Sequence, residues 1–381
     1  MYMMIDNNQI EHNSSINTII NSNESPIYKV FSIESLIYAI SNFLNFEEKK
    51  TLYSVNKKLN IWFRDDIKEI KPHILINSPE IVKRFKNIKK IEISRGNSNN
   101  LCFLKQNEIK NLENLKIQQI KLDDESTLKI SELSKLKSLT LVSNKITDIS
   151  FIQNLNKLSL LDLGNNRLND ISILIQLTNL RILSLHQCGL TNLNILNHKN
   201  FKKLQKLSIG MNSIIDYSFL VNLENLNSLN LYHNNLTSID FFNSLKKYNI
   251  IELNLGENKI NDYSPLLKFK HLLKISLFKN KLSNIDFLNN DCFSGLEELD
   301  LECNQEIKSF EPIINLQNLK KINLINCNLQ NIDFLKKINS KIIKHLYLGS
   351  NPLIPDFLVL SSFNNLQKLI CMIIELKILI G

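Results

Sequence analysis

The sequence predicts an α/β fold, a solenoid whose curved parallel sheet takes one short strand from each repeat. Three observations support this prediction. The nine-residue phrase LxxLxLxxN occurs ten times between Leu136 and Asn351, its last position recurs every 22 to 24 residues, and the repeats form a continuous array over more than half of the 381 residues. A unit of this length cannot bury its apolar side alone, so neighbouring repeats must stack.

A period of 22 to 24 residues with this phrase is the signature of leucine-rich repeats. Asn or Cys closes each phrase, in a column that we call the ladder. We expect each coil to turn sharply after its strand and to leave backbone groups unpaired, which an amide side chain can satisfy. Cys188 and Cys327 place a small thiol in the same slot. The ladder residues are Asn144, Asn166, Cys188, Asn212, Asn234, Asn258, Asn280, Asn304, Cys327 and Asn351.

Alternation within the phrase predicts the two faces of each strand. Leu161 and Leu163 are two residues apart, so on a strand they point to one face, while Asp162 and Gly164 point to the other. Each buried Leu contributes about 1.5 to 3 kcal/mol relative to exposure. We therefore expect a continuous leucine core on one side of the sheet and a polar face on the other.

The repeats alternate in two series, so the better period is 46 or 47 residues. Asn166, Asn212, Asn258 and Asn304 close the first series, which is followed by Asp-x-Ser turns such as Asp216-Tyr-Ser218. Cys188, Asn234, Asn280 and Cys327 close the second, followed by turns such as Asn284-Ile-Asp-Phe287. Two residues before the ladder, the first series has Gly164, Gly210, Gly256 and then Glu302, whereas the second has His186, Tyr232, Phe278 and Ile325.

These bulky residues predict a partner-binding surface on the exposed strand face. Since parallel strands lie about 4.8 Å apart, residues on every second strand should form a stripe with a spacing of about 10 Å. Aromatic side chains are favoured anchors at interfaces. Duplication of a two-repeat unit is the alternative explanation of the alternation. The predicted contact residues are His186, Tyr232, Phe278 and Ile325, with the polar Asp162, Asn230, Asn254 and Asp300 beside them.

The chain before the repeats has a different character. Apolar residues at helical spacing, with Ser32 as an N-cap, predict two short amphipathic helices. The predicted organisation is a disordered polar tail over 1–26, a helical segment over 27–68, a connector with degenerate repeats over 69–111, and the repeat solenoid over 112–381.

The helical segment resembles an F-box. The resemblance rests on the order and spacing of Phe31–Leu44, Phe46-Glu-Glu and Tyr53–Lys58. It implies a substrate receptor of a cullin-RING ubiquitin ligase, in which the helices bind the adaptor subunit and the repeats present a target protein. The implied adaptor-binding residues are Ser32, Leu36, Ile40, Leu44 and Val55.

Two departures from the F-box pattern leave alternatives open. Phe31-Ser32 replaces the usual Leu-Pro, and Glu47-Glu-Lys-Lys replaces the usual Asp-Leu of the second helix. The helices could instead cap the open end of the solenoid. The protein would then be a scaffold, or a regulator that resembles the phosphatase-binding leucine-rich-repeat subunit.

Composition disfavours enzymes, cofactors and nucleic acid. The net charge is +9, but only five of the 46 basic residues are arginine, the residue that favours bidentate phosphate and base recognition. GxxxxGK, HExxH and GxSxG do not occur, so we expect no catalytic residue and no small-molecule substrate. The six cysteines have neither CxxC pairs nor a spacing shared with histidine, so neither a metal nor a cofactor is expected.

The ends of the sequence bear on location. Met1–Asp6 has neither a basic segment nor a long apolar stretch, and the apolar run Leu369–Ile380 is interrupted by charges and too short to span a bilayer. We expect that run to form the last strands of the array, and we expect no membrane association. Two cysteines in the buried ladder favour reduced thiols and a cytoplasmic or nuclear protein.

Overall fold

The computed structural model describes residues 69–70, 88–94, 101, 104, 107–354 and 356–371. The chain divides into two units, Met1–Arg64 and Asp65–Gly381, and all described residues belong to the second. The predicted tail 1–26 and most of the helical segment lie outside the described residues. So do the implied adaptor-binding residues Ser32, Leu36, Ile40, Leu44 and Val55.

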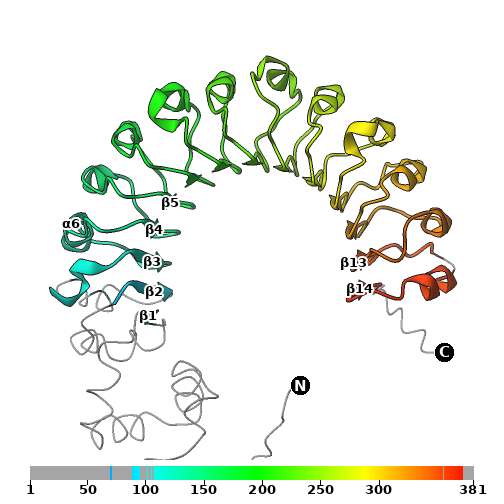
Figure 1. The fold of residues 1–381 in the computed structure, drawn as a ribbon, viewed down its shortest axis with the longest axis horizontal. Helices are drawn as coiled ribbons and strands as arrows, with labels where there is room; N and C mark the ends of the chain where they lie inside the picture. The colour runs from blue at the N-terminus through cyan, green and yellow to red at the C-terminus, as the bar shows by residue number, and fades with distance from the viewer. Residues whose placement is uncertain are drawn as a thin grey trace, which may run out of the picture. The chain divides into compact units, whose positions relative to one another are not determined.

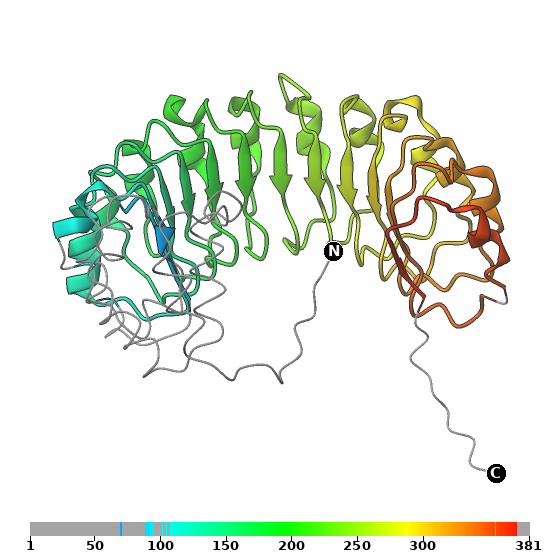
Figure 2. The same ribbon diagram turned by 60° about the horizontal axis from the view of Figure 1, so that its bottom comes forward.

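The described strands form one parallel sheet in which each strand pairs with the next along the chain (Figure 2). Most contain three residues, because each coil must turn soon after its strand. The 14 strands are β1 Glu69–Ile70, β2 Lys90–Ser94, β3 Asn114–Gln118, β4 Ser138–Thr140, β5 Leu160–Asp162, β6 Ile182–Ser184, β7 Lys206–Ser208, β8 Ser228–Asn230, β9 Glu252–Asn254, β10 Lys274–Ser276, β11 Glu298–Asp300, β12 Lys321–Asn323, β13 His345–Tyr347 and β14 Lys368–Ile370.

Short helices occupy the return segments, on the outer side of the curve within this unit, while the strands line its inner side (Figure 1). All but α6 are single 3₁₀ segments. They are η4 Asn107–Asn111, α6 Asp124–Ser131, η5 Ser150–Ile152, η6 Ser172–Gln176, η7 Asn194–Asn197, η8 Lys199–Phe201, η9 Ser218–Asn222, η10 Asp240–Ser244, η11 Ser264–Lys268, η12 Asp286–Asn289, η13 Asp291–Phe293, η14 Glu311–Asn315, η15 Asp333–Lys337 and η16 Leu358–Ser362.

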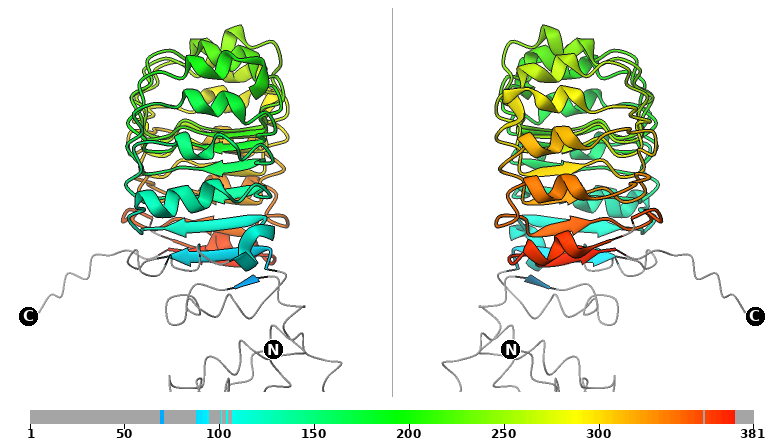
Figure 3. Two further views of the ribbon diagram at one scale, coloured as in Figure 1. Left: turned by 90° about the vertical axis from the view of Figure 1, so that its left-hand side faces the viewer. Right: turned by 90° about the vertical axis from the view of Figure 1, so that its right-hand side faces the viewer.

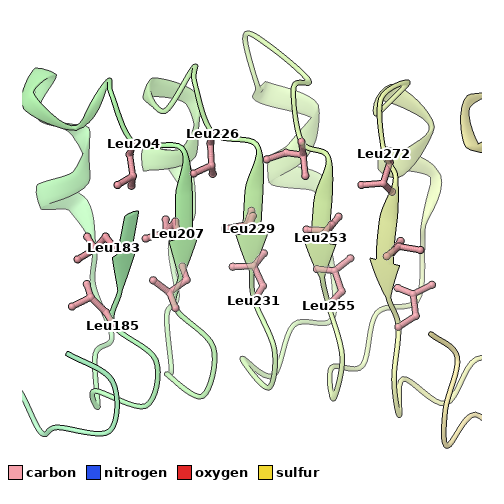
Figure 4. Packing of buried hydrophobic residues seen from close by; sticks show 14 of the residues in the cluster. Leu183, Leu185, Leu204, Leu207, Leu226, Leu229, Leu231, Leu253, Leu255 and Leu272 are labelled. Carbon is pink, nitrogen blue, oxygen red and sulfur yellow. The ribbon is translucent and has the colours of Figure 1, made fainter. Parts of the chain in front are cut away.

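The core lies between the sheet and the helices. Leucine or isoleucine residues two positions apart, in most strands and just after them, point into it, and their neighbours on adjacent strands pack against them in columns (Figure 4). Leu183, Leu185, Leu231 and Leu255 are fully buried. Because the coils stack one on the next (Figure 3), this core is continuous along the array.

The Asp-x-Ser turns start the helices of the first series. In each, an aspartate Oδ1 accepts the backbone N–H of the serine two residues later at 2.8 Å, as Asp216 does from Ser218. This local bond satisfies a donor that a short helix leaves free at its start. The same bond occurs at Asp170 and Asp262, and also at Asp148, in the turn after Asn144 that precedes the two series.

Aromatic pairs join the two kinds of turn and give the 46-residue period a physical reason. The aromatic residue of a first-series turn stacks on the phenylalanine of the following second-series turn, with interplanar angles of 13° to 24°. Each pair fills the space between two coils, so a two-repeat unit is also a packing unit. The pairs and their centroid distances are Tyr217–Phe241 at 4.6 Å, Tyr263–Phe287 at 4.9 Å and Phe310–Phe334 at 5.7 Å.

The predicted repeat solenoid with its long parallel sheet is confirmed. The array starts before the first complete phrase, since β1 and β2 belong to the sheet and Ile91 and Ile93 lie in the core. These coils lack the closing Asn, which explains why the phrase did not identify them. Of the run predicted to form the last strands, β14 includes Leu369 and Ile370, and the part after Cys371 lies outside the described residues.

Candidate functional site

The first-series ladder amides bind both sides of a turn. Asn258 Oδ1 accepts the backbone N–H groups of Asn234 and Leu236, each at 3.0 Å, while its Nδ2 donates to the carbonyls of Leu231 and Leu255. One buried side chain therefore replaces the backbone partners that the turn removes. The same arrangement is found at Asn166, Asn212, Asn304 and Asn351.

The second-series ladder residues mainly donate. Asn234 Nδ2 donates to Ile209 O at 3.1 Å, whereas the buried Oδ1 atoms of Asn234 and Asn280 have no partner among the described residues. Cys188 Sγ donates to Leu163 O at 3.3 Å, in the manner of that Nδ2. A thiol therefore fits this series because only a donor is needed.

Burial keeps both ladder thiols protonated. It raises the pKa of Cys188 to about 11 and the pKa of Cys327 to about 12. Cys327 Sγ donates to Leu301 O at 3.1 Å. Asn144, which precedes the two alternating series, differs from these residues because its Oδ1 accepts the N–H of Ile120 at 2.9 Å.

The inner face is the side of the sheet opposite the leucine core. Its most distinctive feature is a row of three half-buried rings, His186, Tyr232 and Phe278, which we call the aromatic stripe. Neighbouring ring centroids are 6.4 Å apart, with interplanar angles of 25° and 26°. The predicted spacing of about 10 Å is wrong for the rings, although a strand and the second strand along the sheet are separated by about that distance.

Glycines on the intervening strands explain the shorter spacing. An added Cβ at Gly210 would lie 2.9 Å from His186 Nδ1, and one at Gly256 would lie 3.3 Å from Tyr232 Cδ2. His186 thus lies over Gly210 and stacks on Tyr232, and Tyr232 lies over Gly256 and stacks on Phe278. At Gly210 the Cβ would also come within 2.8 Å of Tyr232 O, a backbone atom that cannot easily move. The bulky side chains and the glycines between them therefore form one packed surface.

Ile325 occupies the equivalent position, two residues after the end of β12, but Glu302 instead of a glycine separates it from Phe278. The Glu302 carboxylate accepts from Asn323 Nδ2 at 2.8 Å, and the Ile325 N–H donates to Asn323 Oδ1 at 3.2 Å. The aromatic stripe is thus followed by a polar strand and then by an aliphatic side chain.

The polar residues beside the stripe are fixed by local bonds. In each of the four, an Oδ1 atom accepts the backbone N–H two residues later, at 2.9 to 3.1 Å. The Nδ2 groups of Asn230 and Asn254 have no acceptor within the described part of the chain, whereas Asp300 Oδ2 accepts from Ser276 Oγ at 2.8 Å. The four residues are Asp162, Asn230, Asn254 and Asp300.

A polar cluster at the end of the stripe was not predicted. Glu257 accepts from Tyr232 Oη at 2.7 Å and from Lys279 Nζ at 2.6 Å, and it lies 2.8 Å from His233 Nδ1. The hydrogen bonds from Lys279, Tyr232 and His233 hold the pKa of Glu257 at about 2. The bond to Glu257 raises the pKa of Tyr232 to about 12.

The sequence did contain a signal for this cluster. His233, Glu257 and Lys279 each precede a ladder residue and share a left-handed φ of 50° to 51°. Equivalent positions on consecutive coils lie side by side, so opposite charges there predict an ion pair. The predicted partner-binding surface took in the bulky and polar columns of the strand face and left out this column.

Ion pairs run along the starts of the strands. Lys274 Nζ lies 3.4 Å from Glu252 and 2.9 Å from Glu298, and the pairing continues at each end to Lys206 and Lys321. Glu298 therefore neutralises lysines on neighbouring strands. Asp300, at the end of the same strand, and Glu302, two residues later, form no ion pair with any described residue.

Among the described residues, no group of His, Cys, Asp and Glu side chains could hold a metal ion. Burial lowers the pKa of His186, and its Nδ1 has no hydrogen-bond partner in the described segments. Within the same residues, no helix is long and apolar enough to cross a membrane.

The parallel strands, leucine core and amide ladder define a leucine-rich-repeat solenoid. The chain is similar to an internalin (inlF) of Listeria monocytogenes, with 29% identity and a TM-score of 0.56 over 69% of this chain and 74% of that chain. It is also similar to the leucine-rich-repeat protein LIC12759 of Leptospira interrogans, with 21% identity and a TM-score of 0.57 over 82% and 93%. No protein-family model matches the chain, and no curated protein matches its sequence.

Proposed function

We propose that this protein is a non-enzymatic recognition subunit that binds a protein partner on the inner face. The aromatic stripe carries the proposal, together with Ile325 and the polar side chains beside it. Three rings stacked on a rigid sheet are already ordered, so a partner gains apolar contact at little cost in side-chain entropy. Rings of this kind are the side chains on which interface energy concentrates.

The same geometry favours a protein partner over other ligands. The stripe crosses five strands, from β6 to β10, and is a row of side chains on an open sheet face. Small molecules bind mainly in enclosed pockets, and nucleic acids need unpaired basic groups for their phosphates. The strand-start lysines on this face are paired with Glu252 and Glu298.

Replacement of two rings tests the proposal. We expect Tyr232→Ala combined with Phe278→Ala to reduce recovery of the partner in a pull-down by about tenfold or more, the effect of losing roughly 1.4 kcal/mol. Ile215→Ala is the matched control, because Ile215 is apolar and 85% exposed but lies in a turn outside the stripe. Unchanged recovery by the double variant, with unchanged circular dichroism, would contradict the proposal.

We further propose that residues 27–68 bind the adaptor of a cullin-RING ubiquitin ligase, so that the repeats present a target protein for ubiquitin transfer. This part rests on the F-box resemblance alone. The comparisons do not support it, and the described residues begin at Glu69. We expect a cytoplasmic or nuclear location, which microscopy of a fluorescent fusion would check.

Co-purification with the adaptor tests this second part. Wild type should recover the adaptor, and Leu36→Ala with Leu44→Ala should abolish recovery while the repeats stay folded. The Tyr232→Ala, Phe278→Ala variant should retain the adaptor and so serves as the control. No recovery by wild type would favour a scaffold, or a phosphatase-regulator-like protein, whose N-terminal helices only cap the solenoid.

A further inference from the structure

From β5 to β12, unpaired charge in the middle of the inner face has one sign, although the chain as a whole carries a net charge of +9. Two columns form the middle of this face, the third residue of each strand and the residue two positions later. From β5 to β12 they contain three carboxylates, Asp162, Asp300 and Glu302, and no lysine or arginine. None of the three forms an ion pair with a described residue.

Two of these carboxylates lie beside the last ring. Ser276 pairs with Asp300 across β10 and β11, and the Lys279 N–H donates to Glu302 O at 2.8 Å. Phe278, between Ser276 and Lys279, is therefore one strand spacing, about 4.8 Å, from the coil that carries Asp300 and Glu302. An apolar surface and an acidic pair are thus adjacent.

Hydrogen bonds hold this acidic pair in place. Asp300 Oδ1 accepts the Glu302 N–H at 3.1 Å and Asp300 Oδ2 accepts Ser276 Oγ at 2.8 Å, while Asn323 Nδ2 donates to Glu302 Oε2 at 2.8 Å. Both carboxylates stay half-exposed. Charges fixed in advance bind an opposite charge with a smaller loss of side-chain entropy.

We propose that the inner face binds an extended, basic segment of a protein partner. An aromatic or aliphatic side chain of the segment packs on Tyr232 and Phe278, and a lysine or arginine pairs with Asp300 and Glu302. The Nδ2 groups of Asn230 and Asn254 donate to its backbone carbonyls. This inference rests on the proposed protein-binding function and adds the chemistry of the partner.

The spacing of the strands suits an extended chain. From β8, which ends at Asn230 and is followed by Tyr232, to β11, which ends at Asp300, there are three strand intervals, or about 14 Å. An extended chain advances about 3.3 Å per residue, so four or five residues span this distance. Since the rest of the protein is basic, the acidic pair also directs a basic segment to this face in preference to others.

Selection from a random peptide library tests the proposal. Peptides of about 12 residues displayed on phage would be selected on the immobilised full chain at about 50 mM NaCl, where surface charges are weakly screened. Three variants would be compared with wild type: Asp300→Asn with Glu302→Gln, Tyr232→Ala with Phe278→Ala, and the control Glu306→Gln with Glu311→Gln. The first preserves the fold, because Asn230, Asn254 and Asn323 already make the Asp300 backbone bond at equivalent positions.

We expect peptides enriched on wild type to combine an aromatic or aliphatic residue with lysine or arginine within about five residues. Synthetic versions should bind the Asp300→Asn, Glu302→Gln variant about tenfold more weakly, and this difference should shrink at about 300 mM NaCl. The Glu306→Gln, Glu311→Gln control changes the same number of charges on exposed residues outside the inner face and should bind as wild type does.

Other outcomes separate this inference from the proposed function. Enriched peptides without basic residues, or equal binding by the Asp300→Asn, Glu302→Gln variant, would overturn the proposal that the partner segment is basic. The proposed protein-binding function would still stand if the Tyr232→Ala, Phe278→Ala variant lost binding. Binding that depends on the acidic pair but not on the rings would overturn the proposed role of the stripe. No enrichment of any peptide on wild type would overturn the proposal that the inner face binds an extended segment.

Discussion

At the scale of single residues, the ladder explains why one slot accepts both Asn and Cys. First-series residues must accept two backbone N–H groups as well as donate, which only an amide can do here. Second-series residues need only donate, and Cys188 and Cys327 do so through Sγ–H. The two cysteines of the column occur in this series because of that difference.

This difference predicts unequal costs for the same substitution. Asn258→Cys leaves the buried N–H groups of Asn234 and Leu236 without an acceptor and should lower the free energy of unfolding by about 2 kcal/mol or more. Asn234→Cys retains the donor and removes an oxygen that has no partner, so the loss should be below about 1 kcal/mol. Urea unfolding of the two variants would measure the difference, and equal losses would refute this account of the ladder.

At the scale of elements, pairs of turns stack through aromatic rings, and two of these pairs contain a buried hydroxyl without a hydrogen bond. Tyr217 and Tyr263 are each almost fully buried, and burial raises the pKa of both phenols. Phe310 fills the equivalent position in the third pair. The packing thus requires a ring but not its hydroxyl.

Removal of that hydroxyl should therefore stabilise the protein. We expect Tyr263→Phe to raise the free energy of unfolding by about 1 kcal/mol, because it removes an unsatisfied buried polar group without creating a large cavity. Tyr248→Phe is the control: its hydroxyl donates to Asn243 O at 3.2 Å, so that change should be neutral or slightly destabilising. A clear loss of stability in Tyr263→Phe would show that its hydroxyl is bonded.

The Glu257 cluster joins three coils and predicts a pH dependence. Its folded pKa of about 2 lies below the ordinary value of 4.5, so its contribution to stability is complete above pH 4.5 and is lost as the pH falls toward 2. Urea midpoints for wild type and Glu257→Gln should differ near neutral pH and converge between about pH 4.5 and about pH 2. A difference that stays constant over this range would exclude the carboxylate as its source.

At the scale of the whole molecule, the repeats share one core, and each coil contacts only its neighbours. A coil with neighbours on both sides buries its leucines completely, as at Leu253, which is 2% exposed. Leu369, on the last described strand, is 44% exposed. Burial of the same residue type therefore depends on its position in the array.

This difference in burial should appear in the loss of unfolding free energy when each leucine is replaced. Leu253→Ala should lower the free energy of unfolding by about 2 to 5 kcal/mol, the range for a fully buried leucine, because the closed site cannot collapse around the cavity. Leu369→Ala should cost less than about 1.5 kcal/mol, since much of its surface is already in water. Equal costs in thermal or urea unfolding would contradict this difference in burial between the two leucines.

How far the site followed from the sequence differs between its parts. The column of His186, Tyr232 and Phe278 was predicted from the repeat alternation, since equivalent positions in a solenoid must align. The 6.4 Å stacking was not predicted, because it depends on the space above Gly210 and Gly256. The role of Ser32, Leu36, Ile40, Leu44 and Val55 stays a prediction.

The sequence by itself determined the coil, its register and the faces of its strands. A fixed period and a leucine column admit one way of stacking, because a shift by one residue would expose the core. Only the tertiary structure decided which charges are neutralised and which remain free. Glu257 meets Tyr232 and His233 in addition to Lys279, and Lys274 lies between Glu252 and Glu298, whereas Asp300 and Glu302 face no cation among the described residues. These relations join side chains on different coils, and their lengths and angles decide the contacts, which the order of residues does not specify.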